Sequence, residues 1–551
     1  ALAKGARSHG VRIVENVKVD RIVVENGRAI GVEVEGQLIR AEAVVNAAGM
    51  WARELGDQVG ATVPLHAAEH FYIVTEAVEG ISPTMPVLRD QDGSGYFKED
   101  AGKLLVGWFE PVAKPWGMKG ISEEFSFTSL PEDFEHIAPL IENATHRMNL
   151  LEQVGIRLFF NGPESFTPDD RYLLGEQPEV KGLFVAAGFN SIGIQSSGGA
   201  GKVLADWMLD GHPPMDLWDV DIRRAMPFQR NRSYLRDRTV ETLGLLYAMH
   251  WPFRQPETAR GVRRSILHDR LAAHGACFGE VAGWERPNWY APPGVKPEYE
   301  YSYGRQNWFD YSAAEHNAVR NAVGLFDQSS FAKFVVQGPD AEKVLNHICA
   351  NNMAVPVGKV VYTQWLNERG GIEADLTVTR EAPDRFLVVT AAVTQTRDFA
   401  WLQRQIPADA RAMATDLGAS MAVLGLMNTL KIEGQKNNIR VNAISPVAAT
   451  RMTEGLMPPE VLEKLKPEYV TPGVVYLVSE DAPTGAILTA GAGAFALSRI
   501  FETEGVYLGE GGLSVEEVAA NWEKISDTDG QKAYFAGGEQ GQKFFRKMAG
   551  G

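Results

Sequence analysis

The chain has 551 residues, 45% of them hydrophobic and 23% charged, an ordinary globular balance with material for several hydrophobic cores. At about 100–200 residues per domain, this length predicts about three to five domains. The formal net charge of -16 argues against broad nucleic-acid binding and against attachment to an anionic membrane surface.

Signals for redox chemistry and targeting are sparse. Cys277 and Cys349 do not stand in a CxxC or other metal-like spacing, so we expect no disulfide framework, no metal site and a reducing compartment. No apolar run approaches the roughly 18 residues of a membrane span. The first ten residues lack an initiator Met and the apolar stretch of a signal peptide, and we interpret their amphipathic helical pattern as a cut edge.

Residues 11–50 predict β structure. We expect a first strand at 11–19 and then short strands that break at Asn26-Gly27 and Glu35-Gly36, since Asn-Gly between apolar runs favours a type I′ hairpin turn. A buried strand at 43–49 ends on Ala-Ala-Gly, where Gly49 would let the backbone approach a ligand without an intervening side chain.

The pattern changes several times after residue 60. Residues 60–165 predict an antiparallel sheet with aromatic-rich strands, and residues 183–209 predict a strand, a glycine-rich turn and a helix. Proline clusters between 213 and 293 indicate linkers or boundaries. Residues 310–427 predict alternating helices and strands, and from 428 onward we expect a strand, a loop and an amphipathic helix.

Four long motifs occur in an informative order: AVVNAAGMWA, PLHAAEHFYIVTE, LFFNGPESFTPDDRYLLGE and LFVAAGFNSIGIQSSGGAGK. With them, residues 1–427 resemble the dimethylglycine and sarcosine dehydrogenases. The resemblance implies an FAD-dependent oxidoreductase that removes a methyl group from an N-methyl amino acid. It also favours electron transfer to an electron-transfer flavoprotein, with oxygen as the alternative acceptor, and implies a location in the bacterial cytoplasm or the mitochondrial matrix.

The glycine-rich turn is the strongest candidate for a flavin site. Its backbone N–H groups and the N-terminus of the following helix can face an electron-rich flavin edge or a phosphate. From the resemblance, the flavin contacts are Gly188, Phe189, Asn190, Ser191, Ile192 and Gly193, together with Gly49, and Val17 in the first strand on the adenine side. A purely structural strand-to-helix turn and a plain core valine are the alternative interpretations.

His70 and Tyr96 match positions near the substrate amine in this family. Such a pair could orient the amine and keep its nitrogen unprotonated, because a cationic nitrogen has no lone pair to stabilise the developing iminium. Packing roles in a strand are the alternative. Glu164 and Arg171 are further polar candidates near the flavin ring, with an ion pair or loop shaping as the alternative.

The chain departs from the family pattern at the dinucleotide motif. The strand–GxGxxG–helix that receives the pyrophosphate, and the family's covalent flavin-attachment histidine, are not among these residues. The sequence therefore predicts impaired turnover by this chain.

Residues 286–427 resemble the glycine-cleavage aminomethyltransferase fold, carried by FDQSSFAKFVVQGPDAEKVL and VVYTQWLNERGGIEADLTVTR. The resemblance implies that tetrahydrofolate captures the one-carbon unit. Asp375 matches the acidic residue beside the folate amines, where a carboxylate can take a proton, and Tyr362 and Gln364 are weaker candidates. An Asp closing a Gly-Gly hairpin, and ordinary strand packing, are the alternatives.

The tail from 428 to 551 resembles a short-chain dehydrogenase of the hydroxyacyl-CoA type, with Pro446 and Thr450 near the nicotinamide and phosphate positions. Residues 416–420, where the catalytic Tyr-xxx-Lys should fall, read Asp-Leu-Gly-Ala-Ser, so we expect no such activity. The stretch 422–427 is natural to both families, and a crossover there would make the chain a chimera.

The sequence thus predicts an α/β and α+β multidomain protein with four parts. These are a partial FAD domain at 1–225 whose substrate sheet covers about 60–165, a helical connection at 226–285, a partial folate-binding domain at 286–427 and a partial Rossmann-type segment at 428–551. Oxidative demethylation is the favoured function. A nicotinamide-dependent dehydrogenase relative and an inactive chimeric fragment remain alternatives.

Overall fold

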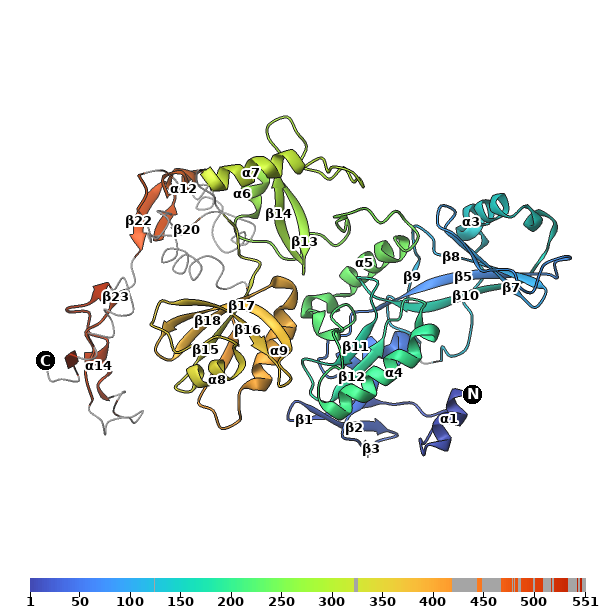
Figure 1. The fold of residues 1–551 in the computed structure, drawn as a ribbon, viewed down its shortest axis with the longest axis horizontal. Helices are drawn as coiled ribbons and strands as arrows, with labels where there is room; N and C mark the ends of the chain where they lie inside the picture. The colour runs from blue at the N-terminus through green and yellow to red at the C-terminus, as the bar shows by residue number, and fades with distance from the viewer. Residues whose placement is uncertain are drawn as a thin grey trace. The chain divides into compact units, whose positions relative to one another are not determined.

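The computed structural model describes residues 1–122, 124–321 and 326–418, and shorter stretches between 443 and 547. Figure 1 shows these residues as a ribbon coloured along the chain. They fall into two compact units. Unit 1 comprises residues 1–263, 277–288 and 298–307, and unit 2 comprises residues 264–276, 289–297 and 308–551. None of the helices in the described ranges is long and apolar enough to cross a bilayer.

Unit 1 begins with helix α1 (Leu2–Ser8) and a three-stranded meander of β1 (Arg21–Glu25), β2 (Arg28–Val34) and β3 (Gln37–Arg40). Asn26 and Gly27 both have positive φ, at 50° and 74°, and Glu35 and Gly36 repeat this with 49° and 74°. Two consecutive left-handed residues are what a type I′ turn requires. The two predicted hairpin breaks are confirmed.

The predicted strand at 11–19 is wrong. These residues pair with no strand in the described structure, and Val17 is 41% exposed instead of lying in a strand. Apolar alternation alone does not make a strand, because the backbone also needs a neighbouring edge to which it can hydrogen-bond. The expected strand at 43–49 is shorter, since β4 covers only Val44–Asn46 and Val45 points to solvent.

A small mixed sheet has the strand order β11 (Leu173–Glu176), β12 (Leu183–Ala187), β4, and β12 runs parallel to β4. After β12 the chain turns at 188–192 and enters helix α4 (Gly193–Asp210), so the predicted strand, turn and helix are confirmed. Leu204 and Trp207 of α4 pack on Leu174 and Phe184 of the sheet. Helix α2 (Ala52–Asp57) contributes Ala52 to the neighbouring core.

The expected antiparallel sheet is present, in the order β10-β5-β8-β7-β6, with β9 also paired to β5. Its strands are β5 (His66–Thr75), β6 (Leu88–Asp90), β7 (Gly95–Asp100), β8 (Lys103–Trp108), β9 (Pro115–Trp116) and β10 (Ile156–Phe166). Helix α3 (Phe134–Arg147) packs on one face, where Phe71, Trp108 and Ile137 are buried together. Because side chains alternate along a strand, the neighbouring positions face the other way.

The connecting region contains helix α5 (Arg232–Gly244) and the short α6 (His268–Ala273), followed by the hairpin β13 (Ala276–Val281) and β14 (Trp284–Tyr290). The predicted helical connection at 226–285 thus contains helices α5 and α6, and strand β13 also starts inside it and pairs with β14. The remaining short 3-10 turns are η1 (Gly49–Trp51), η2 (Asn149–Gln153), η3 (Ile222–Arg224), η4 (Pro227–Arg230), η5 (Ala392–Thr394) and η8 (Pro467–Tyr469).

Unit 2 contains helix α7 (Phe309–Asn321) and a five-stranded antiparallel sheet with strand order β16-β17-β18-β15-β19. The strands are β15 (Ala332–Gln337), β16 (Val360–Leu366), β17 (Ile372–Ala382), β18 (Arg385–Thr390) and β19 (Met413–Asp416). Helices α8 (Ala341–Ile348) and α9 (Gln395–Gln405) alternate with them and share a core around Phe334, Trp365 and Leu402.

The tail holds a sheet of β20 (Ala443–Val447), β21 (Ile487–Gly491) and β22 (Ala494–Ser498), in which β20 and β21 are parallel. It also holds α12 (Thr471–Leu477), α14 (Trp522–Ile525) and the pair β23 (Phe501–Glu502) and β24 (Lys532–Ala533). The strand expected around Pro446 is present. Thr450, the stretch 422–427 and the expected amphipathic helix lie outside the described residues.

Candidate functional site

His70 and Tyr96 meet on the face of the antiparallel sheet opposite helix α3. His70 Nε2 lies 3.2 Å from the Tyr96 hydroxyl, and the two rings are nearly parallel, with 11° between their planes. His70 is 4% exposed, and its Nδ1 has no hydrogen-bond partner among the described residues. An unsatisfied buried nitrogen is costly in an ordinary core, so it marks this face as a candidate site.

Gly107 of β8 determines where the Tyr96 ring lies. It stands opposite Tyr96 in the β7–β8 register, and a Cβ on Gly107 would come within 2.2 Å of the Tyr96 hydroxyl oxygen. The ring can cross toward His70 only because this position has no side chain. Burial, with a smaller contribution from the Glu164 carboxylate, raises the pKa of Tyr96, so the hydroxyl keeps its proton at all physiological pH values.

Two further aromatic side chains complete this face. The Phe109 ring lies 4.8 Å from the His70 ring and 5.2 Å from the ring of Tyr247, which comes from the segment after helix α5. The Tyr247 hydroxyl is buried and has no hydrogen-bond partner in the described part of the chain. Sequence reasoning missed both residues. Phe109 directly follows the aromatic-rich strand β8 and could have been noticed, but Tyr247 is 151 residues after Tyr96 and carries no local signal.

The glycine-rich turn holds its shape through unusual backbone angles. Gly188, Asn190 and Ser191 have φ of 64°, 50° and 65°. Glycine and asparagine tolerate this left-handed region better than most residues. The Asn190 amide oxygen accepts a hydrogen bond from the Thr167 backbone N–H at 2.8 Å, and a Cβ on Gly188 would meet the Thr167 methyl group at 2.6 Å. The turn is therefore fastened to the end of strand β10.

Among the described residues no side chain caps the N-terminus of helix α4, so its first-turn N–H groups have no intrahelical or side-chain acceptor there. Beside them Ile194 is 98% exposed, and Ile192 is also exposed. Free amides at the positive end of a helix suit phosphate or ring oxygens, and exposed apolar side chains suit a flat aromatic ring. These residues fit a flavin dinucleotide.

Strand β10 links the turn to the His70–Tyr96 pair. In the β10–β5 register Gly162 stands opposite His70 and Phe166 opposite His66, while Ser165 accepts a hydrogen bond from the Asn190 backbone N–H. At about 3.3 Å per residue, the three steps from Gly162 to Ser165 span roughly 10 Å along the strand. The two features are thus neighbours, and a ring lying over one can reach the other.

His66 is the first residue of strand β5 and contacts Arg53. The Arg53 guanidinium lies 3.1 Å from His66 Nδ1 and also donates to the Leu65 carbonyl oxygen. Because a guanidinium can only donate, Nδ1 must carry the lone pair and Nε2 the hydrogen. Burial first, and the Arg53 charge second, lower the pKa of His66 to about 4.

The other candidates in unit 1 are more dispersed. Gly49 has φ of 56° and begins η1, directly after β4, with open space where a side chain would stand. Val17 lies in the exposed segment before β1. Glu164 lies on β10, on the same face as His70, whereas Arg171 pairs with Asp219 at the exposed end of its loop. The structure therefore brings His70, Tyr96 and Glu164 together and keeps Arg171 in a surface ion pair.

The folate candidates of unit 2 share one solvent-facing patch. Gln364 stands opposite Asp375 in the β16–β17 register, and its amide nitrogen lies 3.3 Å from the Asp375 carboxylate. A hydrogen bond to Asp375 is also the largest cause of the raised pKa of Tyr362. The intervening residues Thr363 and Trp365 are buried on the core side, so alternation leaves the three candidates on the open face. Asp375 lies within β17, three residues past its start, and does not close the hairpin.

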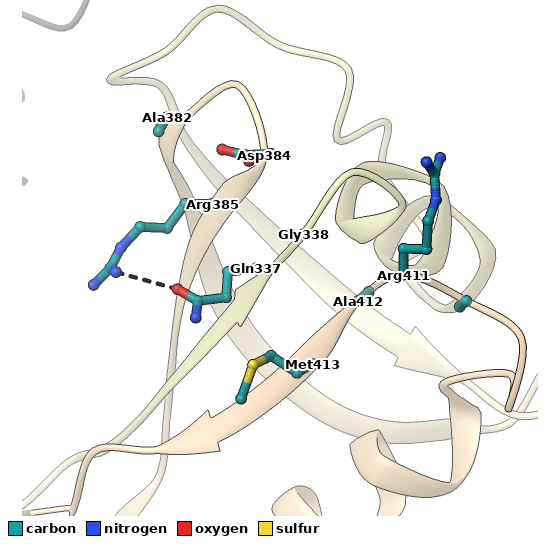
Figure 2. A pocket seen from close by; sticks show the side chains of 9 residues that line it. Gln337, Gly338, Ala382, Asp384, Arg385, Arg411, Ala412 and Met413 are labelled. Carbon is teal, nitrogen blue, oxygen red and sulfur yellow. Dashed lines mark hydrogen bonds between the residues drawn. The ribbon is translucent and has the colours of Figure 1, made fainter. Parts of the chain in front are cut away.

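A separate groove in unit 2 lies at the other end of the same sheet. Figure 2 shows it between the ends of β15, β18 and β19, with a hydrogen bond of 3.3 Å between Arg385 and Gln337. None of the sequence-predicted site residues lines it. Its arginines already pair with Glu381 and Asp340, and we assign it no part in the site.

Comparison with known proteins agrees with this geometry. Residues 1–207 match the FAD dependent oxidoreductase family, residues 210–265 the FAD dependent oxidoreductase central domain, and residues 267–428 the GCVT N-terminal domain. The chain therefore contains a region that matches an FAD dependent oxidoreductase family, followed by a region that matches a GCVT N-terminal domain. These matches confirm the predicted family resemblance and the multidomain α/β and α+β fold, with an FAD domain and a folate-binding domain as the cofactor assignment.

The chain is 46% identical over 461 residues to 4-methylaminobutanoate oxidase (formaldehyde-forming) of Paenarthrobacter nicotinovorans, covering 83% of this chain and 55% of that protein. It is 38% identical over 412 residues to human mitochondrial sarcosine dehydrogenase, covering 69% of this chain and 45% of that protein. The chain thus spans about half the length of these relatives. A putative short-chain type dehydrogenase/reductase of Mycobacterium tuberculosis is 44% identical over 120 residues, 21% of this chain and 42% of that protein.

Proposed function

We propose that this chain takes part in the FAD-dependent oxidative demethylation of an N-methyl amino acid of the dimethylglycine or sarcosine type. The observation that carries the proposal is the His70–Tyr96 pair with its unpartnered, buried His70 Nδ1, fastened through strand β10 to the turn at 188–193. The names of two relatives, a 4-methylaminobutanoate oxidase (formaldehyde-forming) and a sarcosine dehydrogenase, support it.

Bound FAD would supply the hydride acceptor for oxidation of the substrate's N-methyl carbon. An alkylammonium ion has no lone pair to assist this loss, so its proton must leave first. His70 Nδ1 accepts that proton, while Nε2–H donates to the Tyr96 hydroxyl oxygen and holds the imidazole in the tautomer whose Nδ1 is basic. Because the pKa of Tyr96 is raised, its hydroxyl cannot compete as an anionic base.

The residues that would hold FAD are those of the turn, Gly188 to Gly193, with the free N–H groups of helix α4 directed at electron-rich oxygens. Gly49 would allow close approach after β4, and Val17 would contribute an exposed apolar surface on the adenine side. Phe189, whose ring stacks on Tyr172 at 4.7 Å, would stiffen the turn.

The proposal extends to the GCVT domain. There Asp375, supported by Tyr362 and Gln364, would accept the proton released as two tetrahydrofolate nitrogens bond in turn to the iminium carbon and the demethylated amine leaves, giving methylenetetrahydrofolate. Electrons would pass to an electron-transfer flavoprotein, and the enzyme would act in a bacterial cytoplasm or a mitochondrial matrix. The family resemblance supports these two last points, together with the mitochondrial relatives.

Anaerobic reduction of the flavin absorbance band by sarcosine, dimethylglycine and 4-methylaminobutanoate tests the first half. We expect bleaching by at least one of them, slowed about 100-fold or more in His70→Asn, because general base catalysis is worth about 10²–10⁴ in rate. Raising the pH should restore part of the rate in His70→Asn, since more amine is then deprotonated in solution.

Tyr96→Phe should slow bleaching less than His70→Asn and shift the pH profile. Tyr72→Phe is the matched control, since Tyr72 lies on the same sheet face but stacks on Phe160 at 4.7 Å. Flavin that no N-methyl amino acid reduces would contradict the proposal. So would an unchanged rate and pH profile in His70→Asn.

Tetrahydrofolate binding, followed by the quenching of protein fluorescence, tests the second half. Asp375→Asn should weaken binding or the yield of methylenetetrahydrofolate about tenfold, since charge-assisted hydrogen bonds contribute about 1.5–3 kcal/mol. Asp384→Asn, at the exposed β17–β18 turn of the same sheet, is the control. Equal behaviour of the two variants would count against a folate role for Asp375.

The short-chain dehydrogenase resemblance carries no second function. The match covers 120 residues, and residues 416–420 read Asp-Leu-Gly-Ala-Ser where that chemistry requires Tyr-xxx-Lys.

A further inference from the structure

Arg89 lies beside the His70–Tyr96 pair and has no part in the proton chemistry proposed above. It is the central residue of strand β6 and stands directly opposite Tyr96 in the β6–β7 register. Residues opposite each other in an antiparallel pair project from the same face of the sheet. The β6–β7 register therefore assigns Arg89 to the face that carries His70, Tyr96 and Phe109.

The next residue along the strand confirms this orientation. Asp90 is buried toward helix α3, where Arg147 holds its carboxylate with two hydrogen bonds of 2.7 and 3.2 Å. Side chains alternate along a strand, so Arg89 must point away from α3. Its positive charge also reaches Tyr247, where it opposes the rise in the pKa of the hydroxyl that burial causes.

Arg89 is the positively charged residue of this face that stands directly opposite Tyr96 in the register. Within the ranges that the structure describes, its guanidinium makes no ion pair or hydrogen bond, so its N–H donors remain available to a ligand. Lys98 lies on the same face but two residues further along β7, roughly 7 Å toward the β7–β8 turn. The buried Tyr247 hydroxyl, which also lacks a partner, provides a second donor near Phe109.

We propose that Arg89 binds the carboxylate of the N-methyl amino acid, with the Tyr247 hydroxyl as a second donor, and so selects amino acids over simple methylamines. The inference rests on the proposed function, since it places the substrate amine at His70 and Tyr96. A planar guanidinium can grip a carboxylate with two parallel hydrogen bonds, which fixes orientation as well as affinity. The acid end would then be anchored toward the edge strand β6, which leaves the amine with its methyl group at His70 and Tyr96.

Unreactive carbon isosteres separate this binding step from flavin chemistry. Butanoate replaces the nitrogen of sarcosine by carbon, and hexanoate does the same for 4-methylaminobutanoate. The dissociation constants of both acids and of their uncharged amides are measured by ligand-observed NMR on the full chain. We expect at least one acid to bind about tenfold or more tighter than its amide, in line with a charge-assisted bidentate contact.

Arg89→Gln should abolish the preference for the acid over the amide and leave amide binding unchanged. Arg89→Lys should keep part of the preference, because the positive charge remains while the two parallel hydrogen bonds of the guanidinium are lost. Lys98→Gln is the matched control, since it removes one positive charge from the same face and should keep the preference. Both positions are solvent-exposed, and equal thermal midpoints would verify that the variants fold.

Equal binding of acids and amides by the unmodified chain would overturn the proposal, as would a preference that survives in Arg89→Gln or disappears in Lys98→Gln. These outcomes are independent of the flavin-reduction test. If N-methyl amino acids reduce the flavin but Arg89→Gln keeps the preference, the demethylation proposal stands and the carboxylate site is wrong. If the preference depends on Arg89 but no N-methyl amino acid reduces the flavin, the carboxylate site stands and the demethylation proposal is wrong.

Discussion

Acidification should weaken unit 1 through His66. This residue is almost fully buried, with Arg53 against Nδ1 and no acceptor for the hydrogen on Nε2 among the described residues. Its pKa is about 4 in the folded chain, against 6.5 for a free imidazole. The unfolded chain therefore takes up a proton at a pH where the folded chain cannot. Stability from this residue is complete above pH 6.5 and is lost as the pH falls toward 4.

The size of the effect follows from the two pKa values. A shift of about 2.5 pH units corresponds to about 3 kcal/mol once the pH is below both values, at 1.36 kcal/mol per unit. Between pH 7.5 and pH 5 the linkage relation gives about 2 kcal/mol. His66→Gln removes the titration while the amide oxygen can still accept a hydrogen bond from Arg53. The variant should therefore lose about 2 kcal/mol less than the unmodified chain over that interval.

Unfolding of unit 1 can be followed separately by urea denaturation with pulsed hydrogen–deuterium exchange, read by mass spectrometry on peptides of strand β5. Urea midpoints at pH 7.5 and pH 5 are compared for the two proteins. Other titrating groups contribute equally to both, so the difference between the two pH dependences isolates His66. Midpoints that move in parallel in the two proteins would refute the reasoning.

Three further predictions concern packing and charge. Gly244→Ala should destabilise helix α5 although alanine is the better helix former, because a Cβ there would stand 2.0 Å from the Pro111 carbonyl oxygen. Gly198→Ala in α4, where the space is open, should instead stabilise the chain by about 0.5–1 kcal/mol. A thermal scan in which Gly198→Ala melts below Gly244→Ala would contradict this. Leu402→Ala should cost the core of unit 2 about 2–5 kcal/mol in urea denaturation, since Leu402 is fully buried; a loss below 1 kcal/mol would mean that the core is not packed as described. Burial and the neighbouring Asp169 raise the pKa of Asp170 to about 7, so the stability that its protonated form contributes is lost as the pH rises toward and through 7. Asp170→Asn should therefore be more stable than the parent at pH 8 but not at pH 4. Equal differences in melting temperature at the two pH values would exclude this pH dependence.

Local chemistry made much of the flavin half predictable. The hairpin turns at Asn26-Gly27 and Glu35-Gly36 need only two residues that tolerate positive φ, and the strand, turn and helix around Gly188 follow from glycine spacing and apolar periodicity. The segment 11–19 has the same apolar alternation but is not a strand. Pairing requires an edge supplied by another part of the chain, which no local pattern reveals.

The candidate site divides in the same way. The sequence by itself determined which residue types are the candidates: a histidine and a tyrosine proposed for the amine, a glycine-rich turn proposed for the flavin, and an aspartate with a tyrosine and a glutamine proposed for folate. Only the tertiary structure decided that Gly107 leaves room for the Tyr96 ring, that Tyr247 joins the face from a distant segment, and that Arg89 stands opposite Tyr96. The physical reason is that strand register and cross-chain packing depend on the whole sheet, and a one-residue change in register would turn Arg89 to the opposite face.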